Sequence, residues 1–125
     1  MTLQLYAHPF SSYCQKVLIA LYENDVPFTL RMLEPSEKRN LVEFAKLSPM
    51  ARMPVLVDGE RVVLESSVII EYLGLYHPGP VTLVPADAKA ALEVRMLDRV
   101  FDNYIMGQMQ KFVFDRIRPE NVRDA

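Results

Sequence analysis

The dipeptide Asp58-Gly59 constrains the fold of this chain more than any other short segment. It stands between two apolar runs, PVLV and RVVL, that are rich in β-branched residues. An Asp-Gly pair readily adopts the positive φ angles of a tight two-residue turn, so the segment predicts a β-hairpin. The hairpin is followed at once by SSVIIEYLGLY, where helical spacing begins with Ser66 or Ser67 as the N-cap.

The hairpin is preceded by a strand, a helix and a second strand. Residues 3–7 are an apolar strand candidate, and residues 12–24 carry apolar side chains at helical spacing. Residues 27–33 alternate apolar and polar side chains with the period of a strand. A polar break then leads to a second helix, in which Leu41, Phe44, Ala45 and Leu47 share a face.

The predicted order of elements is therefore βαβ, α, ββα. A βαβ unit implies a parallel strand pair with a right-handed crossover, and the hairpin adds antiparallel strands to the same sheet. We predict an α/β fold with a mixed four-stranded sheet and helices on both faces. This is the layout of a thioredoxin-like domain, here over residues 1–77.

A different organisation begins after residue 77. Residues 78–86 form a linker rich in proline and glycine, and residues 87 to about 115 are predicted to form one long helix. Its apolar residues cover more than one narrow stripe, so the helix needs neighbours on several sides. We expect residues 87–125 to be the start of an all-helical C-terminal domain that is incomplete here.

Charge and composition exclude several classes of function. A net charge of −2 gives no reason to expect a nucleic acid as partner. No apolar run is long enough to span a bilayer, and a strand-like segment starts where a signal segment would stand. The single cysteine, Cys14, excludes an internal disulfide and suits a reducing compartment. These features predict a cytoplasmic protein that does not associate with membranes.

The segment AHPFSSYC places two serines and Cys14 at the start of the first helix. Considered by spacing alone, Ser11 or Ser12 caps that helix. A pair of cysteines here would indicate disulfide exchange, but the first position of the pair is Ser11. We interpret Cys14 as a small buried apolar side chain, with a reactive thiol at a helix end as the alternative.

Four segments together resemble a cytosolic glutathione S-transferase: SSYCQKVLIAL, SPMARMPVLVDG, LESSVIIEYL and LVPADAKA. The resemblance extends over residues 3–115 in the family's order. It implies a thioredoxin-like domain that binds glutathione, a helical domain that supplies most of the second-substrate pocket, and a homodimer. The family's usual NPxGKVPVL appears here as SPMARMPVL, with Ala51 in place of glycine and Arg52 in place of lysine among the departures.

The resemblance assigns the catalytic role to Ser11, with Ser12 as the alternative donor. A serine hydroxyl at a helix N-terminus donates a hydrogen bond to the thiolate of bound glutathione, and the helix dipole adds positive charge. The resemblance also implies a cis Met53-Pro54 bond, which exposes the Met53 backbone to the peptide of glutathione. An ordinary trans proline opening a strand is the alternative for Pro54.

The remaining glutathione contacts follow from the same resemblance. Glu65 is expected to pair with the γ-glutamyl ammonium, while Ser66 and nearby backbone N–H groups bind the carboxylate beside it. A capping serine beside an acid that the helix dipole favours is the alternative. Arg52 is expected to meet the glycine carboxylate of glutathione, or else to be a solvated surface residue.

The predicted function is thus a glutathione S-transferase that promotes attack of the glutathione thiolate on an electrophilic small molecule. Glutathione is the co-substrate, and neither a cofactor nor a metal is implied. His8 and His77 each stand beside a proline, with no carboxylate or cysteine at a spacing that suggests a metal site, and His77 is interpreted as a linker residue. The alternatives are a glutathione-dependent isomerase and a non-catalytic glutathione-binding or dimerising scaffold.

Overall fold

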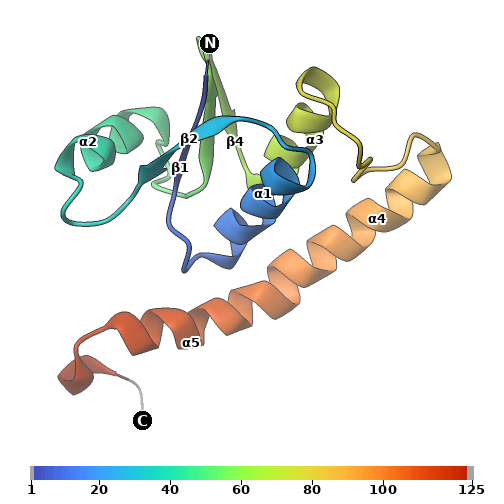
Figure 1. Cartoon of the computed structure of the whole chain (residues 1–125). Coiled ribbons are helices and arrows are strands. Elements are labelled where there is room, and N and C mark those ends of the chain that lie inside the picture. The colour runs from blue at the N-terminus through green and yellow to red at the C-terminus, as the bar shows by residue number, and fades with distance from the viewer. Residues whose placement is uncertain (1, 124–125) are drawn as a thin grey trace. The chain divides into compact units, whose positions relative to one another are not determined.

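The computed structural model describes residues 2–123, and the chain divides between Pro85 and Ala86 into two compact units (Figure 1). The first unit contains all the strands and three helices. Their bounds are β1 (Leu3–Ala7), α1 (Ser12–Glu23), β2 (Phe28–Met32), α2 (Lys38–Leu47), β3 (Val55–Asp58), β4 (Arg61–Leu64) and α3 (Ser66–Tyr76).

The four strands form one sheet in the order β2-β1-β3-β4. Strands β1 and β2 are parallel, and α1 connects them, while β3 runs antiparallel to both β1 and β4. The predicted mixed sheet and its element order are confirmed. The hairpin is also confirmed, although its turn lies one residue later than the dipeptide indicated, because Asp58 still pairs with Arg61. Gly59, with a φ of 63°, therefore opens the turn.

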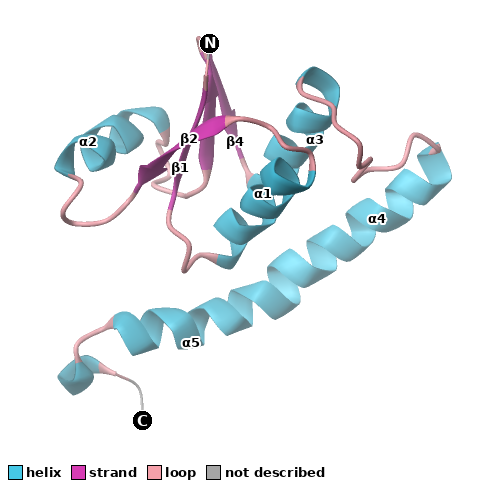
Figure 2. Ribbon diagram, viewed as in Figure 1, coloured by secondary structure: helices cyan, strands magenta, loops and turns pink. Residues whose placement is uncertain are grey.

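Helices cover both faces of the sheet, with α2 on one side and α1 and α3 on the other (Figure 2). Alternation along β1 explains the two cores, because neighbouring side chains of a strand point to opposite faces. Leu3, Leu5 and Ala7 pack with α1 and α3, whereas Tyr6 packs with Phe44 of α2. The core shared by α1 and α3 is the larger one and consists of Leu3, Leu5, Ala7, Cys14, Val17, Leu18, Ala20, Leu21, Leu56, Ile69 and Leu73.

The segment that follows α3 is tied to the end of α1 by a single side chain. Asn24 donates from Nδ2 to the Val81 carbonyl at 3.0 Å and accepts the Val81 N–H at 2.7 Å. A Cβ atom on Gly79 would lie 2.5 Å from Cβ of Asn24, so a glycine is needed for this close approach. The connection therefore has a defined path over the surface of the first unit.

The second unit is built from helices that follow one another without a break. They are α4 (Ala88–Val100), the π-helical segment η1 (Phe101–Met106) and α5 (Gly107–Ile117), and a short turn η2 (Glu120–Val122) follows. Asp87 caps α4 by accepting the Ala90 N–H at 2.9 Å. The long helix agrees with the sequence prediction, but its π-helical middle was not predicted. Many of its large apolar side chains are exposed, including Leu92, Met96, Phe101, Tyr104, Met109 and Phe112.

Candidate functional site

The register of the sheet brings three separate loops to one end of it. Tyr6 pairs with Val55, and Val55 pairs with Leu64, so these residues form one row across β1, β3 and β4. Beyond this row, the chain continues from β1 toward Ser11. Residues 53–54 lead into β3 at the same end of the sheet, and residues 65–66 follow β4 there. Residues far apart in the sequence are therefore gathered at this end of the first unit.

Ser11 is the N-cap of α1 and is buried. Its Oγ accepts the backbone N–H of Cys14 at 3.3 Å, and its own N–H donates to the His8 carbonyl at 3.0 Å. The capping interpretation of Ser11 is therefore correct. The capping bond uses an oxygen lone pair of the hydroxyl and not its proton. Ser12 is the first residue of α1 and is half-buried.

Cys14 is fully buried in the core between α1 and α3. Burial raises the pKa of the Cys14 thiol, while hydrogen bonds from the Ser11 hydroxyl and the His8 backbone oppose this shift. A thiol that is both buried and held in the protonated form is a poor nucleophile. The interpretation of Cys14 as a small apolar side chain is confirmed.

Residues 48–52 form a tight turn before β3, and Ser48 organises it. The buried Ser48 hydroxyl accepts the Arg52 N–H at 3.0 Å and donates to the Arg52 carbonyl at 3.2 Å. Ala51 closes the turn by donating its N–H to the Ser48 carbonyl, and it has a φ of 52°. This positive φ explains why the family pattern has glycine at this position. The Arg52 side chain itself is exposed.

The Met53-Pro54 peptide bond is cis, as the resemblance implied. Pro54 is buried and Met53 is half-buried. Met53 lies two residues before Val55, the first residue of β3, and thus beyond the last antiparallel pair with β1. Its backbone is in this way placed at the end of the sheet where β1 runs toward Ser11.

Glu65, and not a serine, is the N-cap of α3, so the expectation that Ser66 or Ser67 caps this helix was wrong. Glu65 has a φ of 71° and makes no side-chain capping bond. A non-glycine residue rarely adopts this backbone conformation, which turns the chain sharply from β4 into α3. The turn leaves the Glu65 side chain exposed and the Ser66 side chain buried at the helix start.

The loop between β1 and α1 is held by His8 and Gln15. The Phe10 N–H donates to Nδ1 of His8 at 3.1 Å, and the Gln15 side chain donates to the Pro9 carbonyl at 2.7 Å. Further along α1, Nζ of Lys16 donates to the Ser67 hydroxyl at 3.1 Å. This last bond links the second turn of α1 to the first turn of α3, and sequence analysis did not identify it.

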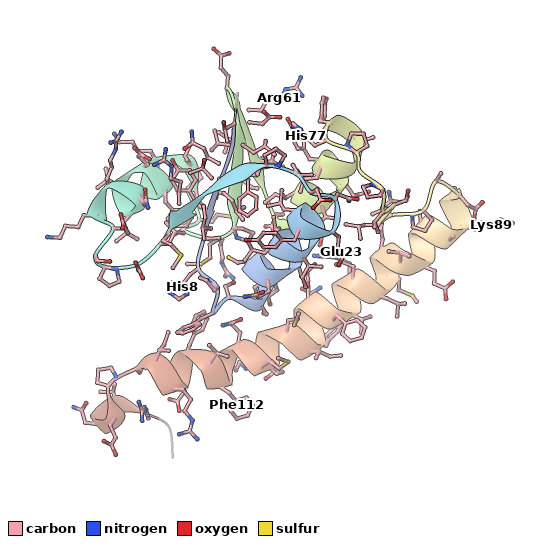
Figure 3. All side chains as sticks on the ribbon, viewed as in Figure 1. His8, Glu23, Arg61, His77, Lys89 and Phe112 are labelled. Atoms are coloured by element: carbon pink, nitrogen blue, oxygen red, sulfur yellow. The ribbon has the colours of Figure 1, made fainter. Side chains whose placement is uncertain are left out.

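A second polar cluster lies at the opposite end of the sheet, around the β3–β4 turn. Asp58 accepts hydrogen bonds from the Tyr72 hydroxyl at 2.5 Å and lies 2.9 Å from Nε2 of His77. These bonds from His77 and Tyr72 lower the pKa of the Asp58 carboxyl. Figure 3 labels His77 and Arg61 at this end and His8 at the other. The partner of His77 is 19 residues away, and sequence analysis, which treated His77 only as a linker residue, did not identify it.

Residues 2–123 contain no group of three or more His, Cys, Asp or Glu residues that could hold a metal ion. Within the same residues, no helix has the length and apolar character needed to cross a membrane.

Comparison with known proteins finds one matching family and several proteins of similar sequence. Residues 5–81 match the family described as glutathione S-transferase, N-terminal domain. Human glutathione S-transferase theta-1 is 34% identical over 95 residues, which are 75% of this chain and 40% of the human protein. Protein LigF of Sphingobium sp. is 33% identical over 106 residues, which are 83% of this chain and 41% of LigF.

Solved structures of proteins with similar sequences also have a similar fold. The crystal structure of the β-etherase LigF has a TM-score of 0.78 at 27% identity, covering 97% of this chain and 54% of that one. A glutathione S-transferase of Methylobacterium radiotolerans in complex with glutathione sulfonate has a TM-score of 0.75 at 32% identity, covering 100% of this chain and 57% of that one. The chain thus spans about two fifths of the length of the curated relatives named above.

Proposed function

We propose, because this chain belongs to the glutathione S-transferase family, that its first unit binds glutathione and activates the thiol for attack on an electrophilic small molecule. The observation that carries this proposal is the gathering of Ser11, the Met53 backbone and the Glu65-Ser66 pair at one end of the sheet. The same end is where the N-termini of α1 and α3 lie, and both carry partial positive charge.

Ser11 is the proposed catalytic residue. Its hydroxyl oxygen caps α1, which holds the hydroxyl at the helix start, and its proton can be donated to a glutathione thiolate. This hydrogen bond and the helix dipole both stabilise the thiolate over the thiol. The thiol proton leaves to solvent, and the thiolate then forms a bond to the electrophilic carbon, which in an aryl halide expels the halide ion. Ser12 remains the alternative donor.

The other proposed contacts are assigned in turn to the three residues of glutathione. We assign the γ-glutamyl ammonium to the exposed Glu65 carboxylate and the neighbouring carboxylate to Ser66 and the N-terminus of α3. The Met53 backbone pairs with the cysteinyl peptide, and the exposed Arg52 binds the glycine carboxylate. Glutathione is the only co-substrate in this scheme, and it requires no metal.

Cleavage of an aryl ether is a second candidate reaction. The match to LigF spans 83% of this chain, against 75% for theta-1, and the LigF structure is described as a β-etherase. In this reaction the thiolate would attack the carbon of the ether bond and displace a phenoxide. The proposed binding of glutathione and the role of Ser11 are the same for both reactions.

Two variants of Ser11 in the full-length protein test the proposal. Ser11→Ala removes the cap and the donor, whereas Ser11→Asp keeps a capping oxygen, removes the donor and adds a negative charge that itself disfavours a nearby thiolate. We expect both to raise the thiol pKa of bound glutathione and to lower kcat/KM with an aryl halide on the order of 100-fold. Glutathione binding without turnover of aryl halides or aryl ethers would instead indicate a non-catalytic scaffold.

We further propose that the protein is a cytoplasmic homodimer. The lone, buried Cys14 suits a reducing compartment, and exposed apolar side chains on β4 and α3, such as Val62, Val68 and Leu75, give the first unit a surface that a second copy could cover. Light scattering of the purified full-length protein should give twice the mass of one chain. A monomeric mass at micromolar concentration would contradict the dimer.

A further inference from the structure

Ser48 uses its backbone and its side chain to hold the segment before β3. Its own N–H donates to the Phe44 carbonyl at 2.9 Å, and its carbonyl accepts the Ala51 N–H at 3.0 Å. Its hydroxyl accepts the Arg52 N–H at 3.0 Å and donates to the Arg52 carbonyl at 3.2 Å. Because Ser48 is buried, water competes little for these bonds. One hydroxyl thus holds both backbone polar groups of the residue before Met53.

Apolar packing fixes the residues on either side of this backbone. Ser48 is the C-cap of α2, and Phe44 of α2 lies in the core between that helix and the sheet. The Met53 side chain packs against both cores of the first unit. Neither contact fixes the plane of the peptide between Arg52 and Met53, because a rigid peptide plane rotates through the two soft dihedrals that flank it.

The Ser48 hydroxyl fixes that plane. In a trans peptide the carbonyl and the N–H point to opposite sides, so the bond from Ser48 to the Arg52 carbonyl directs the Met53 N–H away from Ser48. A half-turn of the plane would reverse the Met53 N–H, and it would also leave the buried hydroxyl without its acceptor. The bonds to Arg52 therefore favour one orientation of the peptide that apolar packing alone leaves free.

We propose that Ser48 is a positioning residue for glutathione, an inference that rests on the proposed function. Met53 and Arg52 are the residues proposed to bind the cysteinyl peptide and the glycine carboxylate. Ser48 holds the peptide between them in its binding orientation before glutathione arrives. A site that has this orientation for only a fraction of the time binds more weakly by that fraction. Ser48 thus acts on glutathione affinity, whereas the acidity of the bound thiol depends on Ser11 and α1.

The test compares Ser48→Ala and Ser48→Thr in the full-length protein, with Asn24→Ala as a matched control. The Asn24 side chain likewise makes two hydrogen bonds to the backbone of one residue, but it lies at the other end of α1 from Ser11. Calorimetry measures the affinity for glutathione. We expect Ser48→Ala to weaken binding about 3- to 10-fold, as the loss of one hydrogen bond implies. Ser48→Thr keeps the hydroxyl and should restore most of the affinity. Asn24→Ala should leave it unchanged.

Two further measurements separate positioning from a general loosening of the fold. In Ser48→Ala, the thiol pKa of bound glutathione and kcat at saturating glutathione should equal those of the parent, because Ser11 keeps its place on α1. The KM for glutathione should rise with the loss of affinity. A loosened fold would instead change kcat and the thiol pKa together with KM.

Parental glutathione affinity in Ser48→Ala, or a thiol pKa that changes together with the affinity, would overturn the inference and leave the proposed function standing. If the parent itself neither binds glutathione nor lowers its thiol pKa, the proposed function fails instead. Should Ser48→Ala not fold, Ser48→Cys makes the same comparison, because a thiol fills the space of the hydroxyl and is only a weak hydrogen-bonding group.

Discussion

Replacing Ala51 with glycine is expected to increase the free energy of unfolding of the first unit. Ala51 has a φ of 52°, in the left-handed region that residues with a Cβ atom adopt at a cost of about 1–2 kcal/mol. Glycine adopts this conformation freely, but it also gives the unfolded chain more freedom, which costs about 0.4–1 kcal/mol. The net expected gain is about 0.5–1 kcal/mol. Because Ala51 is exposed, its removal leaves no cavity to reduce this gain.

The matched control is the same substitution at Ala45, an exposed position inside α2. There the backbone is helical, so Ala45→Gly should lower the free energy of unfolding by about 1 kcal/mol. Urea denaturation followed by circular dichroism measures both variants, and equal m-values would show that the two unfold like the parent. The two substitutions should therefore change the midpoint in opposite directions.

A loss of stability in Ala51→Gly similar to that in Ala45→Gly would refute this reasoning. It would mean that residue 51 does not have a left-handed backbone in solution. The turn held by Ser48 would then have a different path, and the placement of Arg52 and Met53 beside β3 would have to be revised.

Three further predictions concern single side chains of the first unit. Asn24→Ala removes both hydrogen bonds to Val81, so limited proteolysis should cut the segment after α3 faster than in the parent. An unchanged cutting rate would contradict the role of these bonds in holding the segment. The lowered pKa of Asp58 means that its contribution to stability is full above about pH 4 and is lost as the pH falls through the folded-state pKa. Asp58→Asn should therefore have a flatter decline of stability between pH 5 and 3 than the parent, and parallel curves would count against this. Cys14 should react with a thiol reagent only when urea unfolds the chain, and rapid reaction of the native protein at neutral pH would show that its burial is wrong.

The sequence was sufficient for the order of elements along the chain, the parallel β1–β2 pair and the β3–β4 hairpin, because these depend on local patterns, but the antiparallel pairing of β1 with β3 was not predicted. Alternating side chains indicated β2, and the segment around Gly59 indicated the hairpin. Where two local signals competed, sequence reasoning chose wrongly. Serine is a common N-cap, yet Glu65 begins α3, because the sharp turn out of β4 is made one residue earlier and at a positive φ. No local preference of glutamate predicts that conformation.

Contacts between distant side chains could not be predicted for a different reason. Asp58 meets His77, and Lys16 meets Ser67, only because α3 packs back across the sheet beside α1. The residues of each pair are separated by 19 and 51 positions, and neither spacing is characteristic of a motif. Such pairs follow from the register of the strands and the crossing of the helices, which have to be known first.

Ser11 illustrates how a structural and a functional role can depend on the same geometry. Sequence analysis treated capping of α1 and donation to a thiolate as alternatives, but the two use different parts of one hydroxyl group. The capping bond directs an oxygen lone pair toward the N–H of Cys14, and this fixes the hydroxyl at the positive end of the helix. The same hydroxyl also hydrogen-bonds the Cys14 thiol, so its proton has to turn toward a thiolate that binds at the helix start. The capping bond is therefore a condition for the proposed catalytic role of Ser11, and evidence for the one does not weaken the other.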